Sequence, residues 1–120
     1  MNVVVEVRDI VRRWHVRTLV GVPLRSDQML TWLPAKVLAD LGVVPSKTID
    51  LQRESGRVFQ RRCGGVLLTI HDRTTVDDVV FAEDDDAISI GWRVLAGLNL
   101  EFDSRVNDLV DRGPIPAAAS

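Results

Sequence analysis

Hydrophobic residues occur mostly in short runs rich in β-branched side chains, the pattern typical of strands. The expected strands cover residues 3–7, 15–22, 48–53, 57–61, 65–71, 76–82, 88–90, 100–102 and 108–110. Only residues 34–41 and 92–98 have the spacing of helices. Pro34 suits the first turn of a helix, and Gly42 suits the position after its end. The pattern therefore predicts an all-β domain with two short helices.

The same pattern predicts the turns and the core. Glu54-Ser55-Gly56 separates two strands and predicts a hairpin turn, and the polar run 83–86 predicts an acidic turn. The second helix should follow Ile90-Gly91 and pack beside residues 24–28. The residues expected in the core are Val5, Val20, Leu33, Val37, Leu38, Leu41, Leu67, Ile70, Val79, Phe81, Ile90, Leu95, Leu98 and Phe102.

Length and charge narrow the class of protein. The chain of 120 residues suits one domain, expected over residues 1–112, with a loose C-terminal tail over 113–120. With 15 basic and 17 acidic residues, the net charge of −2 attracts neither nucleic acid nor acidic lipid. No apolar run approaches the roughly 20 residues that span a bilayer. We therefore expect a cytoplasmic protein with no nucleic-acid partner and no membrane partner.

Other reactive residues give weaker signals. The one cysteine, Cys63, excludes an internal disulfide. Arg61-Arg62 before it could lower its pKa, but no Cys/His arrangement can be argued from His15 and His71. The basic, aromatic segment 12–17 predicts an exposed hairpin rather than a nucleic-acid contact. We expect no metal site and no cofactor.

Four motifs occur in a characteristic order. Thr31-Trp32-Leu33-Pro34 precedes the first helix, and a hairpin is centred on Ser55-Gly56. Ser89-Ile90-Gly91 leads into the second helix, and residues 97–103 (GLNLEFD) are followed by GPIP. In this order the chain resembles the retropepsin-like aspartic proteases, in particular their small stand-alone bacterial branch.

The resemblance implies a fold and an assembly. It implies an acid protease fold, a closed β-barrel-like half-domain that forms a homodimer by pairing its chain termini in a shared sheet. Each chain of such a dimer supplies one Asp-Thr-Gly loop, and the two carboxylates share a proton and activate water. A cleft would hold an extended peptide or protein ligand. The implied flap residues are Glu54, Ser55, Gly56 and Arg57, and the residues supporting the loop are Ile90 and Gly91.

The catalytic motif itself is not intact. Without a gap from Pro34, Arg25 takes the place of the aspartate, Ser26 that of the threonine or serine, and Asp27 that of the glycine. Alignment on Leu19-Val20 instead places the aspartate at Gly21, with an insertion afterward. A guanidinium stays protonated and cannot act as a base. We therefore expect a retropepsin-like homologue that is catalytically impaired or inactive.

Two alternatives remain open. An active aspartic endopeptidase would use a displaced Asp27 as its catalytic residue, although a shift of two residues moves a side chain by up to ~7 Å. A non-catalytic dimer would instead bind peptides or act as a scaffold. In either dimer, two copies of Arg25 would approach each other and each would need an anion, for which Asp27 of either chain is the nearest in sequence.

Overall fold

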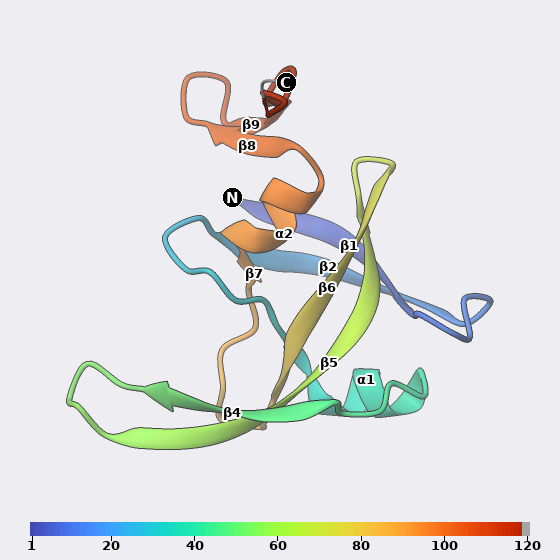
Figure 1. Cartoon of the computed structure of the whole chain (residues 1–120), viewed down its shortest axis with the longest axis vertical. Helices are drawn as coiled ribbons and strands as arrows, with labels where there is room; N and C mark the ends of the chain where they lie inside the picture. The colour runs from blue at the N-terminus through green and yellow to red at the C-terminus, as the bar shows by residue number, and fades with distance from the viewer. Residues whose placement is uncertain (119–120) are drawn as a thin grey trace.

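The structure is a computed structural model that describes residues 1–118, and strands dominate it (Figure 1). Within these residues it has two helices of six residues each. In chain order the elements are β1 (Asn2–Asp9), β2 (Val16–Arg25), β3 (Trp32–Pro34), α1 (Ala35–Asp40), β4 (Lys47–Gln52), β5 (Val58–Ile70), β6 (Arg73–Ala82), β7 (Ile90–Gly91), α2 (Trp92–Gly97), β8 (Leu100–Asp103) and β9 (Asp108–Asp111). The predicted all-β class with two short helices is confirmed.

Seven strands form one strongly curved, barrel-like sheet that is nearly closed. Its order is β3-β6-β5-β1-β2-β7, and β4 pairs with β5 outside this path. The β4–β5 hairpin extends well beyond the barrel (Figure 1). Strands β8 and β9 form a separate two-stranded sheet beyond α2, at the opposite end of the molecule from this hairpin (Figure 1).

Two parallel pairings bring distant segments together. The end of β2 pairs with β7, so that Leu24 lies opposite Ile90 and Arg25 opposite Gly91. The chain then turns through residues 26–31, called here the 26–31 loop, and enters β3, which pairs with the end of β6. The 83–89 connection leads from β6 to β7. The two ends of the segment 24–34 are therefore both paired with one later segment of the chain, residues 80–91.

The expectation that Val20 is buried is wrong. Val5 pairs with Leu19 and Val3 with Val22, so β2 uses one more residue than β1 over this interval. This bulge includes Gly21, whose φ of +72° favours glycine. The extra residue shifts the alternation of faces, and Val20 is left 77% exposed while Val22 is buried.

Strand β5 also differs from the prediction. Residues 57–61 and 65–71 were expected as two strands, but β5 runs without interruption from Val58 to Ile70. Its first half pairs with β4 and its second half with β6, with Cys63 paired on both sides. Pairing with these two strands keeps β5 continuous through Gly64-Gly65, although glycine has a weak intrinsic preference for strands. Strand β3 was not predicted, because three residues are too few for a period to be recognised.

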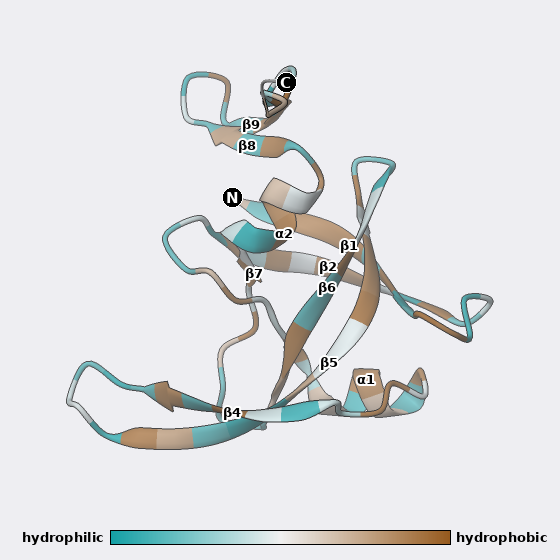
Figure 2. Ribbon diagram, in the orientation of Figure 1, coloured by the Kyte–Doolittle hydropathy of each residue, from teal (hydrophilic) through white to brown (hydrophobic). Residues whose placement is uncertain are grey.

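The remaining core predictions are largely confirmed. Leu67 and Phe102 are only partly buried, and the other predicted core residues apart from Val20 are buried. Figure 2 shows hydrophobic residues concentrated in the central strands and hydrophilic residues at the hairpin tips. The barrel therefore gives a rigid base for the segments at its edge.

The C-terminal segment begins in contact with the body and continues without regular structure. The side chain of Asn99 donates a hydrogen bond of 2.9 Å to the carbonyl oxygen of Gly113. Residues 112–118 form no helix or strand, and the rest of the predicted tail, 119–120, lies outside the described residues. Over residues 1–118, neither helix has the length or apolar character required to cross a bilayer.

Candidate functional site

The 26–31 loop is held against the start of α2. The backbone N–H of Trp92 donates to the carbonyl oxygen of Gln28 at 2.7 Å, and that of Arg93 to Met29 at 3.3 Å. The side chain of Thr31 is fully buried, and its hydroxyl oxygen accepts from the N–H of Gly91 at 2.8 Å. These bonds fix the loop from both ends, and α2 packs beside residues 24–28 as predicted.

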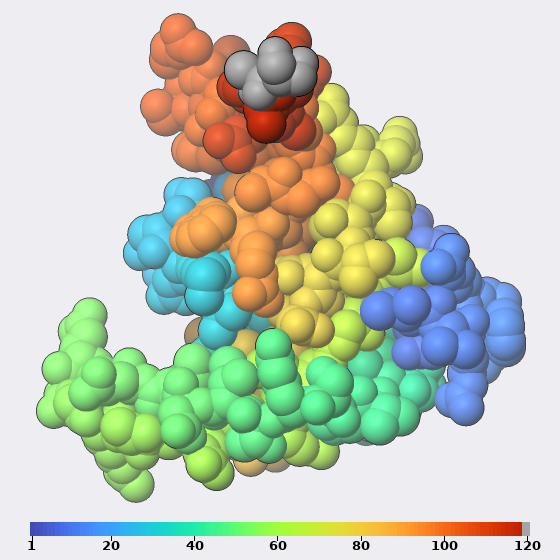
Figure 3. Space-filling model, in the orientation of Figure 1, coloured from blue at the N-terminus to red at the C-terminus, as the bar shows by residue number. Residues whose placement is uncertain are grey.

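A cavity of about 500 Å³ lies between this loop, the β4–β5 hairpin and the 83–89 connection. Figure 3 shows the hairpin extending beneath the loop with a hollow between them. We call this cavity the cleft. Its lining residues are Arg25, Gln28, Trp32, Gln52, Arg53, Glu54, Phe59, Asp85, Asp86, Ala87 and Ser89.

The three residues expected at the motif position, Arg25, Ser26 and Asp27, differ in whether they line the cleft. Arg25 lines it, whereas Ser26 lies at a different hollow beside Trp92, and Asp27 lines neither. All three are exposed. Within residues 1–118, Asp27 makes no ion pair and no side-chain hydrogen bond. The only one of the three side chains in the cleft is therefore a guanidinium.

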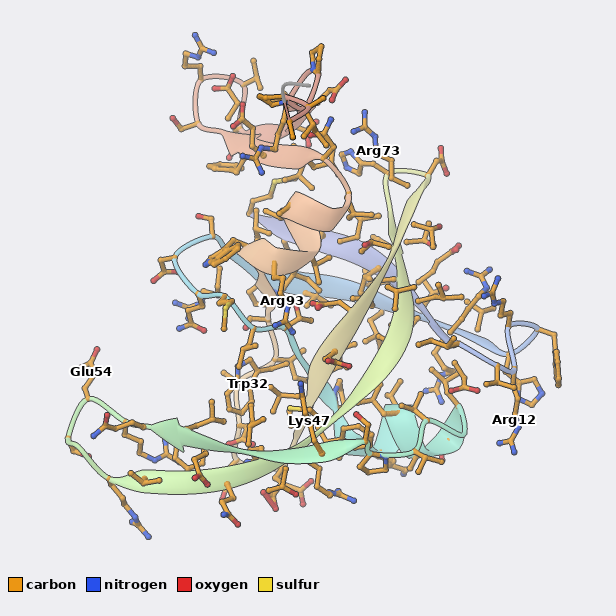
Figure 4. The ribbon with its side chains drawn as sticks, viewed as in Figure 1. Arg12, Trp32, Lys47, Glu54, Arg73 and Arg93 are labelled. Atoms are coloured by element: carbon orange, nitrogen blue, oxygen red, sulfur yellow. The ribbon has the colours of Figure 1, made fainter. Side chains whose placement is uncertain are left out.

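The residues proposed for the flap form the hairpin turn. The N–H of Gly56 donates to the carbonyl oxygen of Arg53 at 2.8 Å, which closes the turn predicted from Glu54-Ser55-Gly56. Of the four implied flap residues, Glu54 lines the cleft, and Ser55, Gly56 and Arg57 complete the tip outside it. In Figure 4, Glu54 lies at the far end of the hairpin, and Trp32 lies near its base.

The cleft side of the hairpin carries a stack of charged and aromatic side chains. The guanidinium carbon of Arg53 lies 4.3 Å from the centre of the Phe59 ring, and that of Arg61 lies 4.8 Å from it. Cation–π contacts of this kind contribute about 0.5–1 kcal/mol each at exposed sites. The stack orders the hairpin surface that faces the cleft.

Arg61 also connects the hairpin to the opposite wall. Its Nε lies 2.6 Å from Oδ2 of Asp86 and its Nη2 lies 2.9 Å from Oδ1, a bidentate pair. Asp86 accepts a further bond from the N–H of Glu83, and its side chain is only 8% exposed. The hydrogen bonds from Arg61 lower the pKa of Asp86 below its ordinary value. Asp86 is therefore a structural carboxylate and a poor base.

This pairing predicts a pH dependence of the hairpin. A carboxyl whose pKa is lowered by folding stabilises the folded state above its ordinary pKa, and that contribution is lost as pH falls through the lowered pKa. We expect amide exchange protection in β4 and the start of β5 to fall as pH is lowered below the ordinary carboxyl range. Hydrogen exchange, corrected for intrinsic rates, measures this.

The matched control is Asp86→Asn. This variant should show reduced protection already at neutral pH and a much smaller acid-dependent loss at the hairpin, which comes from the exposed Glu83 carboxylate 2.9 Å from Nη1 of Arg61. If wild-type protection there does not change with pH, the contact between Arg61 and Asp86 does not hold the hairpin.

A second buried carboxyl lies outside the cleft. Asp77 on β6 pairs with Arg93 on α2 at 2.7 Å, and its side chain is 9% exposed. Burial raises the pKa of Asp77 in spite of the arginine. In Figure 4, Arg93 lies in the body of the molecule near α2. This pair joins the sheet to the helix that holds the 26–31 loop.

The cysteine and histidines add no chemistry to the cleft. Cys63 is buried, and burial raises the pKa of its thiol, so the preceding pair Arg61-Arg62 does not lower that pKa below its ordinary value. His71 lies in the β5–β6 turn and His15 in the exposed β1–β2 connection. Across residues 1–118, no three His, Cys, Asp or Glu side chains come together as a metal site would require.

Sequence reasoning missed most of the cleft wall. Arg53, Phe59 and the contact of Arg61 with Asp86 were not predicted as parts of a site. One signal existed, because the acidic turn 83–86 and the basic pair Arg61-Arg62 carry opposite charges. Arg61 and Asp86 are 25 positions apart in the sequence, so their pairing could not be predicted without the course of β6.

Comparison with known proteins gives no family assignment. No protein-family model matches the chain, and no curated protein matches it significantly.

Proposed function

We propose that this chain is a retropepsin-like homodimer that binds an extended peptide or protein segment in its cleft without cleaving it. The observation that carries the proposal is the position of Arg25. It lies at the end of β2, paired in parallel with Gly91, and it lines the cleft where the resemblance implies a catalytic aspartate. An arginine can donate hydrogen bonds there but cannot accept a proton from water.

The remaining carboxylates near the cleft also favour binding over catalysis. A shared-proton mechanism needs two carboxylates within reach of one water molecule. Asp86 is held by Arg61, and Asp27 does not line the cleft. The two other carboxylates that line it, Glu54 and Asp85, are exposed. The hairpin that forms one wall of the cleft provides backbone groups and the half-buried ring of Phe59, which suit an extended chain.

Unpaired strand edges support the proposed homodimer. Residues 2–5 of β1 pair with β2 only, since the β1–β5 pairing begins at Glu6. Strands β8 and β9 pair only with each other, so both outer edges of their small sheet are free within residues 1–118. Free edges of this kind pair readily with another chain. Sedimentation at micromolar concentration should show a dimer, and a monomer alone would exclude the shared sheet.

One experiment tests the absence of cleavage. A reduced, denatured protein labelled with fluorescein is incubated with the wild type at pH 4 to 6, with and without pepstatin. We expect an increase in anisotropy, which reports binding, and no pepstatin-sensitive fragments. The double variant Arg25→Asp with Asp27→Gly recreates Asp-Ser-Gly in the ungapped register, and we expect it to gain cleavage with an acid optimum.

Each other result has a defined meaning. If the wild type cleaves and Asp27→Asn abolishes the activity, Asp27 is a displaced catalytic residue and the proposal is wrong. If the wild type neither binds nor cleaves, the binding function is wrong. If the wild type binds and the double variant binds without cleaving, the lost chemistry extends beyond this loop and the binding function stands.

A further inference from the structure

Arg25 brings an unmatched positive charge to the cleft. It is exposed and lines the cavity at the end of β2. Within residues 1–118 its guanidinium makes no ion pair and no side-chain hydrogen bond. A guanidinium remains charged at every accessible pH and presents five N–H donors in a planar fork. An anion in the cleft would therefore find a free bidentate partner.

The other charged residues of the cleft leave this position unmatched. Asp86 is occupied by Arg61 and by the N–H of Glu83. Asp85 and Glu54 are exposed and make no ion pair with Arg25. On the hairpin wall, Arg53 adds a second guanidinium, which lies over the Phe59 ring and also has no ion pair within the described residues. Arg25 and Arg53 thus approach the cleft from different walls.

We propose that the cleft selects a peptide that carries an acidic side chain, Asp or Glu, and that this carboxylate pairs with Arg25. The inference rests on the proposed peptide-binding function and specifies its ligand. Trp32 and Phe59 line the same cavity, so a large apolar residue next to the acidic one completes the match. The carboxylate of the peptide pairs with the guanidinium of Arg25, and the apolar residue covers the two rings.

The test uses defined peptide pools. Nonapeptide pools labelled with fluorescein hold the central residue as Glu, Gln or Lys and randomise every other position. Binding to the full chain is measured by anisotropy. For the wild type we expect the Glu pool to bind about tenfold more tightly than the Gln pool, as a charge-assisted bidentate pair requires. Arg25→Gln should remove this preference, and Arg25→Glu should reverse it in favour of Lys.

Arg12→Gln is the matched control. It removes the same charge from the exposed β1–β2 connection, outside the lining of the cleft and away from the β4–β5 hairpin (Figure 4). This variant should keep the full preference for Glu, because general electrostatic attraction is the only contribution it loses. A preference lost equally in both variants would assign it to overall charge and overturn the inference.

The remaining outcomes separate this inference from the proposed function. If all pools bind the wild type equally, peptide binding stands and the acidic selection is wrong. If no pool binds, the binding function fails and the inference fails with it. If Arg25→Gln weakens the dimer in sedimentation and Arg25→Asp with Asp27→Arg restores it, Asp27 of a second copy is the anion, and the inference is overturned.

Discussion

Replacing Gly91 with alanine is expected to lower the free energy of unfolding by about 3 kcal/mol, the upper end for overpacking at a rigid site. A Cβ at this position would meet the carbonyl oxygens of Met29 and Leu30 at distances that atoms do not adopt. Relief is difficult, because Met29 accepts from Arg93 and the neighbouring Thr31 is buried against Gly91. The 26–31 loop would have to move away from α2.

Urea denaturation measures this loss, with Gly113→Ala as the control. Gly113 has a φ of +85° and no atom within 4 Å of its Cβ position, so alanine there costs only the conformational strain of about 1 kcal/mol. Peptide binding should weaken in Gly91→Ala as well, because Arg25 reaches the cleft from the same segment. Equal losses in the two variants would show that the loop is not packed tightly on Gly91.

Local patterns predicted the elements that depend on local chemistry. The helix after Pro34 and the turn at Glu54-Ser55-Gly56 need only their own residues, and both form where expected. The alternation of β1 likewise identifies Val5 as buried. Such features are determined by propensity and period, which are properties of a short window.

Features that depend on strand partners were not predictable in this way. Val20 continues the apolar pattern of β2, but the bulge that exposes it exists only because of the register with β1. Strand β3 forms because β6 lies beside it, not because of its own three residues. One sequence provides no information about which segments pair when they are far apart in the chain.

The same distinction, between features set by local sequence and features set by distant contacts, applies to the candidate site. The expected departure from Asp-Thr-Gly at Arg25 rests on the resemblance and on counting back from Pro34 without a gap, and it stays a prediction. Whether Arg25 or Asp27 enters a cavity depends on the turn after β2, and only the structure places Arg25 in the cleft. The stack of Arg53 on Phe59 could not be predicted for a different reason, since a spacing of six residues does not show that the two side chains lie on the same side of a hairpin.

Replacing Arg93 with leucine is expected to cost about 3 kcal/mol at neutral pH, the lower end for a broken buried ion pair, because Arg93 itself is 36% exposed and partly screened. The partner left behind, Asp77, is 9% exposed, and its Oδ2 has no hydrogen-bond partner within residues 1–118. The variant also loses the bond from Arg93 to the carbonyl oxygen of Asp78. An unpaired carboxylate would then remain buried between β6 and α2.

The cost of this variant should depend on pH in a definite direction. Because burial raises the pKa of Asp77, the folded state binds a proton more readily than the unfolded state does. The contribution of Asp77 to the stability of the folded state is therefore largest below the ordinary carboxyl pKa and declines as pH rises through the raised pKa. Arg93 opposes the effect of burial, so Arg93→Leu should raise this pKa further and extend the decline to higher pH.

Urea midpoints between pH 4 and 8 measure the decline, and adding Asp77→Asn to Arg93→Leu should abolish the extended part. A loss in Arg93→Leu that is constant with pH and unchanged by Asp77→Asn would mean that Arg93 acts through its packing and not through Asp77.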